Sequence, residues 1–65
     1  MNIIAHTKYG VFQSKETEFT PTEYEKSTKF LEQIHNLEFL SFETDDGELY
    51  MTKEMINDSL FILQK

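Results

Sequence analysis

Two histidines are the side chains best suited to acid–base chemistry near neutral pH, because imidazole titrates in that range. His6 falls in a predicted strand, and His35 falls at the end of a predicted helix. No serine nucleophile motif or glycine-rich loop accompanies either of them. Catalysis requires several groups in a defined constellation, which a lone imidazole does not supply. We therefore expect a protein that is not an enzyme.

An acidic cluster near a glycine is the second candidate for chemistry; it contains Glu43, Asp45, Asp46 and Glu48. If Gly47 were the sixth residue of a calcium-binding EF-hand loop, Phe42 and Lys53 would occupy the first and twelfth positions. Neither side chain is a carboxylate ligand, so the motif fails. The chain also has no cysteine to bind a metal. We expect no metal and no cofactor, and we interpret Asp45 and Asp46 as turn residues.

The charge balance argues against direct binding of nucleic acid. The chain has twelve acidic residues, six lysines and no arginine, which gives a net charge of −6. Arginine makes the bidentate contacts to phosphate and guanine that dominate DNA recognition. In size, charge and composition the chain is similar to small acidic bacteriophage proteins that inhibit DNA-handling enzymes by imitating DNA, although no motif matches a particular inhibitor family. This DNA mimicry is the alternative function.

The length of 65 residues predicts one small domain, over residues 1–65, that lacks disulfides to stabilise it. No apolar run reaches the ~20 residues that span a bilayer, and no signal peptide is visible, so we expect a cytoplasmic protein without membrane contact. Association with a second copy is the remaining way for so short a chain to bury more apolar surface. We therefore expect a homodimer.

Several signals predict a helix that begins after Thr20. Thr20 and Glu23 match a capping box, and Pro21 stands at the first helical position, where its missing N–H costs nothing. Apolar side chains then recur at helical spacing, at Tyr24, Phe30, Leu31 and Ile34. The helix is expected over about 21–35, with Asn36 ending it in the left-handed conformation.

The other segments predict short strands and one helical turn. Gly10 and Gly47 are the expected turn or bulge positions, and Asp46-Gly47 is a hairpin signal that calls for positive φ at the glycine. Strands are expected over 2–7, 11–14, 37–44, 48–51 and 59–64, with a helical turn over about 53–57. The fold class is therefore α+β: a small antiparallel sheet of about four to five strands, with the helix packed on one face and the helical turn before the last strand.

One helix covers one face of such a sheet, so apolar residues remain for contacts with other proteins. We predict that the interaction residues are Phe39, Phe42, Tyr50, Leu60, Phe61 and Ile62, with the acidic residues Asp45, Asp46 and Glu48. The function expected from the sequence is that of a small acidic binding or regulatory protein of bacterial or bacteriophage type. Its expected partners are a second copy and a host protein.

Overall fold

Strands and helices alternate along the chain, as in the expected α+β class. A computed structural model describes all of residues 1–65. The elements are β1 (Asn2–Thr7), β2 (Gly10–Gln13), α1 (Pro21–Glu32), the 3₁₀ turn η1 (Ile34–Asn36), β3 (Phe39–Thr44), β4 (Gly47–Thr52), α2 (Lys53–Asn57) and β5 (Leu60–Gln64). The α+β class is confirmed, with one main helix and a short helix directly before the last strand.

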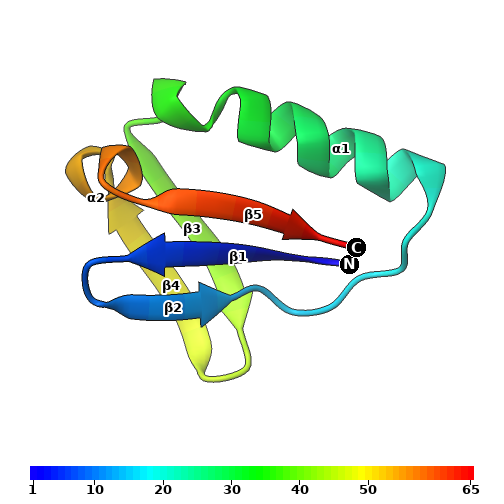
Figure 1. The fold of residues 1–65 in the computed structure, drawn as a ribbon, viewed down its shortest axis with the longest axis horizontal. Helices are drawn as coiled ribbons and strands as arrows, with labels where there is room; N and C mark the ends of the chain where they lie inside the picture. Colours follow the sequence, from blue (N-terminus) through cyan, green and yellow to red (C-terminus); the bar gives the residue numbers. More distant parts are fainter.

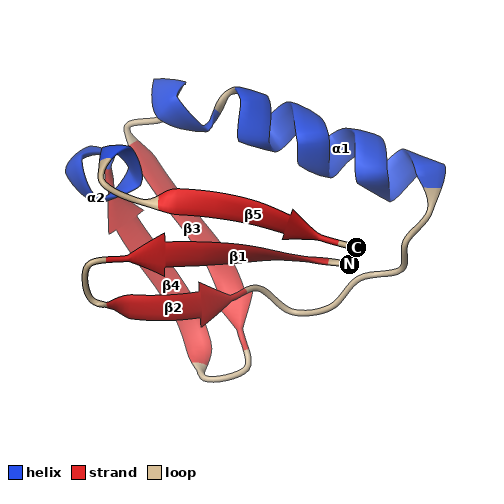
Figure 2. Ribbon diagram, viewed as in Figure 1, coloured by secondary structure: helices blue, strands red, loops and turns tan.

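The five strands form two antiparallel sheets, which refines the expectation of one sheet. The first sheet has the order β2-β1-β5, and the second is the β3-β4 hairpin. The three-stranded sheet lies in front of β3 and β4, which cross behind it, and α1 runs alongside β5 (Figures 1 and 2). Because the two sheets cover each other's inner faces, the single long helix needs to close only one side of the molecule.

The core lies between the two sheets and is small. Its central cluster has four buried side chains, contributed by η1, β3, β4 and α2: Ile34, Leu40, Met51 and Ile56. Ala5 of β1 is fully buried as well, and in the whole chain only 7 of 65 residues are buried. No residue of α1 is buried, but its Phe30 and Leu31 pack against the cluster. Strands β3, β4 and β5 thus contribute alternate residues to a thin core.

The start of α1 matches the sequence prediction in most details. The Thr20 hydroxyl accepts a hydrogen bond from the Glu23 N–H at 3.1 Å, and Pro21 is the first helical residue. Phe19 packs on Tyr24 with 5.7 Å between the ring centroids, so a hydrophobic staple holds the incoming chain. The Thr20 N–H bonds to the Glu18 carbonyl instead of the Glu23 side chain. Only one half of the capping box is therefore formed.

The end of α1 differs from the prediction. The helix stops at Glu32 instead of residue 35, and a 3₁₀ turn follows, with the Asn36 N–H donating to the Gln33 carbonyl at 2.9 Å. No residue other than glycine has positive φ, so the expected left-handed Asn36 is wrong. The tighter turn accompanies the placement of Ile34 in the core, where 2% of its surface is exposed. Burial of this side chain outweighs the local preference of Asn36.

Replacement of Thr20 by alanine tests the helix start. Thr20→Ala is expected to lower the free energy of unfolding by about 1 kcal/mol, because the Glu23 N–H loses its acceptor. Thr22→Ala is the matched control, since Thr22 lies exposed inside the first turn and its side chain makes no hydrogen bond within the protein. Urea denaturation measures both variants. Equal losses for the two variants would contradict the capping role of Thr20.

Both hairpins use the same four-residue turn, Thr-x-x-Gly. In the first, the Thr7 hydroxyl accepts from the Tyr9 N–H at 3.1 Å and donates to the Gly10 carbonyl at 2.9 Å. In the second, the Thr44 hydroxyl makes the equivalent bonds, at 3.2 Å and 2.8 Å. The glycines have φ values of 135° and 131°. Positive φ at Gly47 is confirmed, but this glycine follows the two central turn residues and is not one of them.

Candidate interaction surfaces

The two histidines do not meet in a common site. His6 is exposed on β1, whereas His35 lies in η1 with its Nδ1 3.3 Å from the Asn57 Oδ1. None of the three pockets of the protein is lined by either histidine. No group of three or more histidine, aspartate or glutamate side chains is placed to hold a metal ion. The absence of enzymatic activity stays a prediction.

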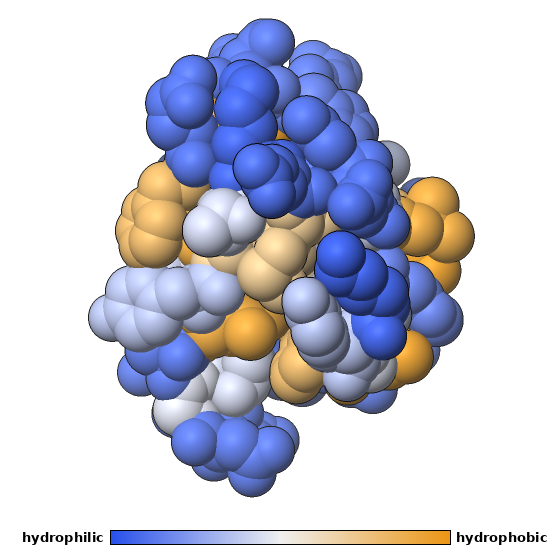
Figure 3. Space-filling model, turned by 90° about the vertical axis from the view of Figure 1, so that its left-hand side faces the viewer, coloured by the Kyte–Doolittle hydropathy of each residue, from blue (hydrophilic) through white to orange (hydrophobic).

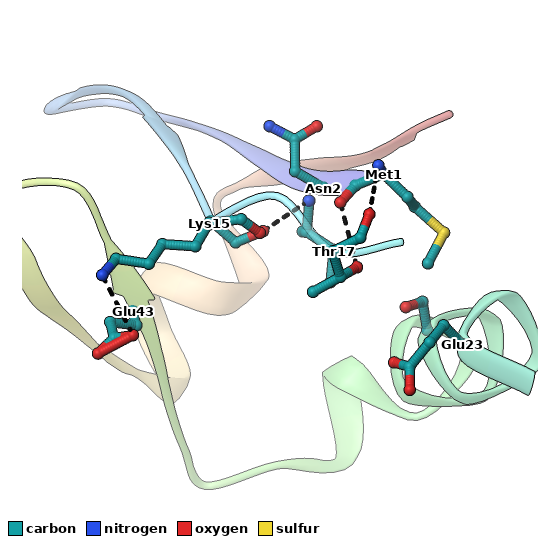
Figure 4. A pocket seen from close by; sticks show the side chains of 9 residues that line it. Met1, Asn2, Lys15, Thr17, Glu23 and Glu43 are labelled. Atoms are coloured by element: carbon teal, nitrogen blue, oxygen red, sulfur yellow. Dashed lines mark hydrogen bonds and ion pairs between the residues drawn. The ribbon is translucent and has the colours of Figure 1, made fainter. Parts of the chain in front are cut away.

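One hollow is a pocket of about 300 Å³ where the N-terminal strand, the segment after β2 and α1 meet. Lys15 and Glu43 lie on one side of this pocket and Glu23 of α1 lies on the other (Figure 4). Its charges are already compensated within the protein. The Met1 ammonium lies 2.6 Å from a Glu16 carboxylate oxygen, and the Lys15 Nζ lies 3.6 Å from Glu43.

One buried polar atom near this pocket lacks a partner. The amide nitrogen of Asn2 donates to the Gln13 side chain at 3.1 Å, but the Asn2 Oδ1 accepts no hydrogen bond. The Asn2 side chain points away from the other labelled residues of the pocket (Figure 4). The charged groups that line the pocket therefore all have partners within the protein, and no set of free polar groups converges on it.

The outer face of the β2-β1-β5 sheet is mainly apolar; we call it the three-strand face and define it by Ile4, His6, Val11, Leu60 and Ile62. Strand pairing aligns Val11, His6 and Leu60 in one row across the sheet, and Ile4 with Ile62 in the next, where Gln13 is the β2 member. Leu60 is 63% exposed and Val11 57%. No helix or strand lies in front of this sheet (Figure 1). The strands that form the face carry no acidic residue.

The outer face of the β3-β4 hairpin is the second candidate; we call it the two-strand face and define it by Phe39, Ser41, Glu43, Glu48 and Tyr50. Phe39 and Tyr50 are 55% and 62% exposed, and their ring centroids lie 5.6 Å apart. Toward the turn, Glu43 and Glu48 are direct cross-strand partners. The face is therefore aromatic at one end and acidic at the other.

The structure divides the predicted interaction residues among four places. Leu60 and Ile62 belong to the three-strand face, and Phe39, Tyr50 and Glu48 to the two-strand face. Asp45 and Asp46 are exposed at the tip of the β3-β4 hairpin, next to the two-strand face. Phe42 and Phe61 are half-buried and pack against the core cluster. Phe42 and Phe61 are thus mainly core residues.

Sequence reasoning missed two apolar members of the three-strand face. Ile4 and Val11 lie on strands whose apolar residues occupy both faces, so period-two alternation does not indicate which of them point outward. Pairing with β5 settles the question, because Ile4 aligns with Ile62. A view onto the α2 end of the molecule shows apolar surface at both flanks (Figure 3). Exposed apolar side chains thus lie on two opposite sides of the protein.

Comparison with known proteins identifies no relative: no family model, no curated protein and no solved structure matches this chain. Neither helix is both long enough and apolar enough to cross a bilayer. The chemistry of the two outer faces is therefore the feature of the protein that points to a function.

Proposed function

We propose that this chain is a small non-enzymatic binding protein that acts through protein–protein contacts and forms a homodimer through its three-strand face. The observation that carries the proposal is an uncovered sheet face with exposed Val11, Leu60 and Ile62. Exposed apolar patches of this kind in soluble proteins mark contact surfaces, because their exposure to water is unfavourable.

The absence of acidic residues from the strands of this face favours a second copy as its occupant. Two copies of a chain with net charge −6 repel each other. The strands of the three-strand face carry no carboxylate, so two such faces meet without placing acids of these strands against each other. The face is self-complementary in chemistry, as a two-fold interface requires.

The side of the protein that carries the three-strand face is large enough for a stable contact. The protein measures 31 × 26 × 16 Å, and the three-strand face, together with the outer surface of α1, lies on the broad 31 × 26 Å side (Figure 1). The whole side offers on the order of 800 Å², which is what each partner contributes to a typical specific interface, so the three-strand face is the centre of the proposed contact. Dimerisation also extends a core in which only 7 residues are buried.

Light scattering coupled to size-exclusion chromatography tests the homodimer. The wild-type protein is expected at twice its 7.7 kDa chain mass at micromolar concentration. Leu60→Lys places a charge in the interface and is expected to raise the dimer dissociation constant at least about tenfold. Phe39→Lys is the matched control, because Phe39 is similarly exposed but lies on the other face. A folded monomeric wild type, or equal effects of both variants, would refute this dimer.

The alternative function, an acidic inhibitor that imitates DNA, requires carboxylates on one rigid face. The structure spreads them over α1, the segment before it, the β3-β4 hairpin and α2. Only the hairpin gathers four in a short stretch, and there Lys15 already pairs with Glu43. This inhibitor function stays a prediction.

A further inference from the structure

We propose that the two-strand face docks a basic segment of a partner protein, and that this segment supplies an arginine to Tyr50 and Glu48. The inference rests on the proposed role in protein–protein contacts and names the chemistry of the partner. It does not depend on the homodimer, because the three-strand and two-strand faces are the outer faces of different sheets.

The aromatic end of the face provides the anchor. Phe39 and Tyr50 are diagonal cross-strand neighbours whose rings meet at an interplanar angle of 32°. Both rings remain more than half exposed. An exposed aromatic pair offers a large apolar area and a negative ring face, which attracts a guanidinium group.

The acidic end provides the charge. Glu48 has no basic partner within the protein, nor have Asp45 and Asp46 at the adjacent hairpin tip. Glu43 and Glu48 are direct cross-strand partners, and the Lys15 Nζ lies 3.6 Å from Glu43. The carboxylate of the face that has no counter-charge is therefore that of Glu48. A cation bound beside Glu48 supplies this counter-charge, so the face is complementary to a positively charged ligand.

The spacing of the two ends favours arginine over lysine. Tyr50 and Glu48 lie two residues apart on one strand, so they project from the same face at ~7 Å. A guanidinium group is planar, stacks on an aromatic ring and donates two parallel hydrogen bonds to a carboxylate. It therefore contacts Tyr50 with its flat side and Glu48 with its edge. An ammonium group is a point charge and lacks the planar surface for this stacking.

A second copy of this chain does not fit the same position. The sequence contains no arginine, so the proposed contact requires a different protein. Self-association through this face would also bring the carboxylates of Glu43 and Glu48 against those of the other copy, which is unfavourable. The expected occupant is therefore a heterologous, basic protein segment.

Binding of two peptides of equal charge tests the inference. Acetylated octa-arginine and octa-lysine are titrated into the full-length ¹⁵N-labelled protein at about 150 mM salt, where long-range charge attraction is screened. Octa-arginine is expected to bind at least about threefold more tightly, with the largest amide shifts on β3 and β4. Equal affinities, or shifts centred on other elements, would overturn the proposal.

Matched variants separate the specific contact from general attraction to an acidic protein. Tyr50→Leu keeps an apolar side chain but removes the ring, so the preference for octa-arginine is expected to disappear. Tyr9→Leu, at another exposed tyrosine in the β1-β2 turn, is expected to retain the preference for octa-arginine.

Glu48→Gln is expected to weaken octa-arginine binding more than Glu18→Gln, which removes the same charge outside the hairpin. Persistence of the preference in Tyr50→Leu would refute the ring contact.

Light scattering on the same samples distinguishes this inference from the homodimer. An intact dimer without arginine preference overturns only the docking proposal, and a monomer that retains the preference overturns only the dimer. If Tyr50→Leu changes the molecular mass in solution, the two-strand face is a self-association surface and the docking proposal is wrong.

Discussion

Ile56→Ala is expected to lower the free energy of unfolding by about 3 kcal/mol, the largest effect of any single truncation in this protein. Ile56 lies on α2, has no exposed surface and contacts the core cluster formed with Ile34, Leu40 and Met51. The loss combines the transfer free energy of the deleted methyl groups with the cost of the cavity that remains. A single core in so small a domain supplies about 3–5 kcal/mol in total, so the variant is expected to be largely unfolded.

Ile62→Ala is the matched control for this prediction. It removes the same atoms from a side chain that is 40% exposed on the three-strand face. The expected cost is below about 1 kcal/mol, because less apolar surface loses its protein environment. Urea denaturation followed by circular dichroism measures both variants, and two protein concentrations separate folding from dimerisation. If Ile56→Ala costs no more than Ile62→Ala, the position assigned to α2 in the core is wrong.

Gly47→Val is expected to cost about 2 kcal/mol through the backbone alone. Gly47 has a φ of 131°, which is strongly unfavourable for a β-branched residue. A Cβ at this position meets no atom within 4 Å, so steric contact with the rest of the protein adds nothing. The stability loss therefore reports the conformation of the turn, and thermal or urea denaturation measures it.

Two further substitutions control for the turn prediction. Glu48→Val introduces the same side chain at the next residue of β4, which has no positive φ, and is expected to leave stability within about 0.5 kcal/mol. Gly10→Val is expected to cost as much as Gly47→Val, because Gly10 occupies the equivalent position of the first turn with a φ of 135°. A large difference between the two glycines would show that the hairpins do not share one turn geometry.

The two proposed faces together suggest how the protein engages a partner. A dimer formed through the three-strand faces leaves both two-strand faces exposed, because these lie on the other sheet. Two equivalent docking surfaces on one particle strengthen binding to a partner that presents two basic segments, provided that the spacing matches. The proposed homodimer and the proposed docking of arginine thus use separate surfaces of one small protein.

The interaction residues show where sequence reasoning succeeded and where it stopped. The run Leu60–Leu63 was correctly interpreted as a strand, but all its residues are apolar, so alternation did not indicate which side chains face the core. Pairing of β5 with β1 directs Phe61 inward beside Ala5 and leaves Leu60 and Ile62 outside. The same ambiguity concealed Ile4 and Val11.

The sequence by itself determined the features that are stabilised by hydrogen bonds between residues close together along the chain. The Thr20 cap, the turns at Gly10 and Gly47 and the cap of α2 at Thr52 each join residues no more than three positions apart. Only the tertiary structure decided that the strands separate into two sheets, that α1 stops at Glu32 and that the exposed apolar residues form two faces. These features depend on burial against segments distant along the chain, and local residue preferences carry no information about such partners.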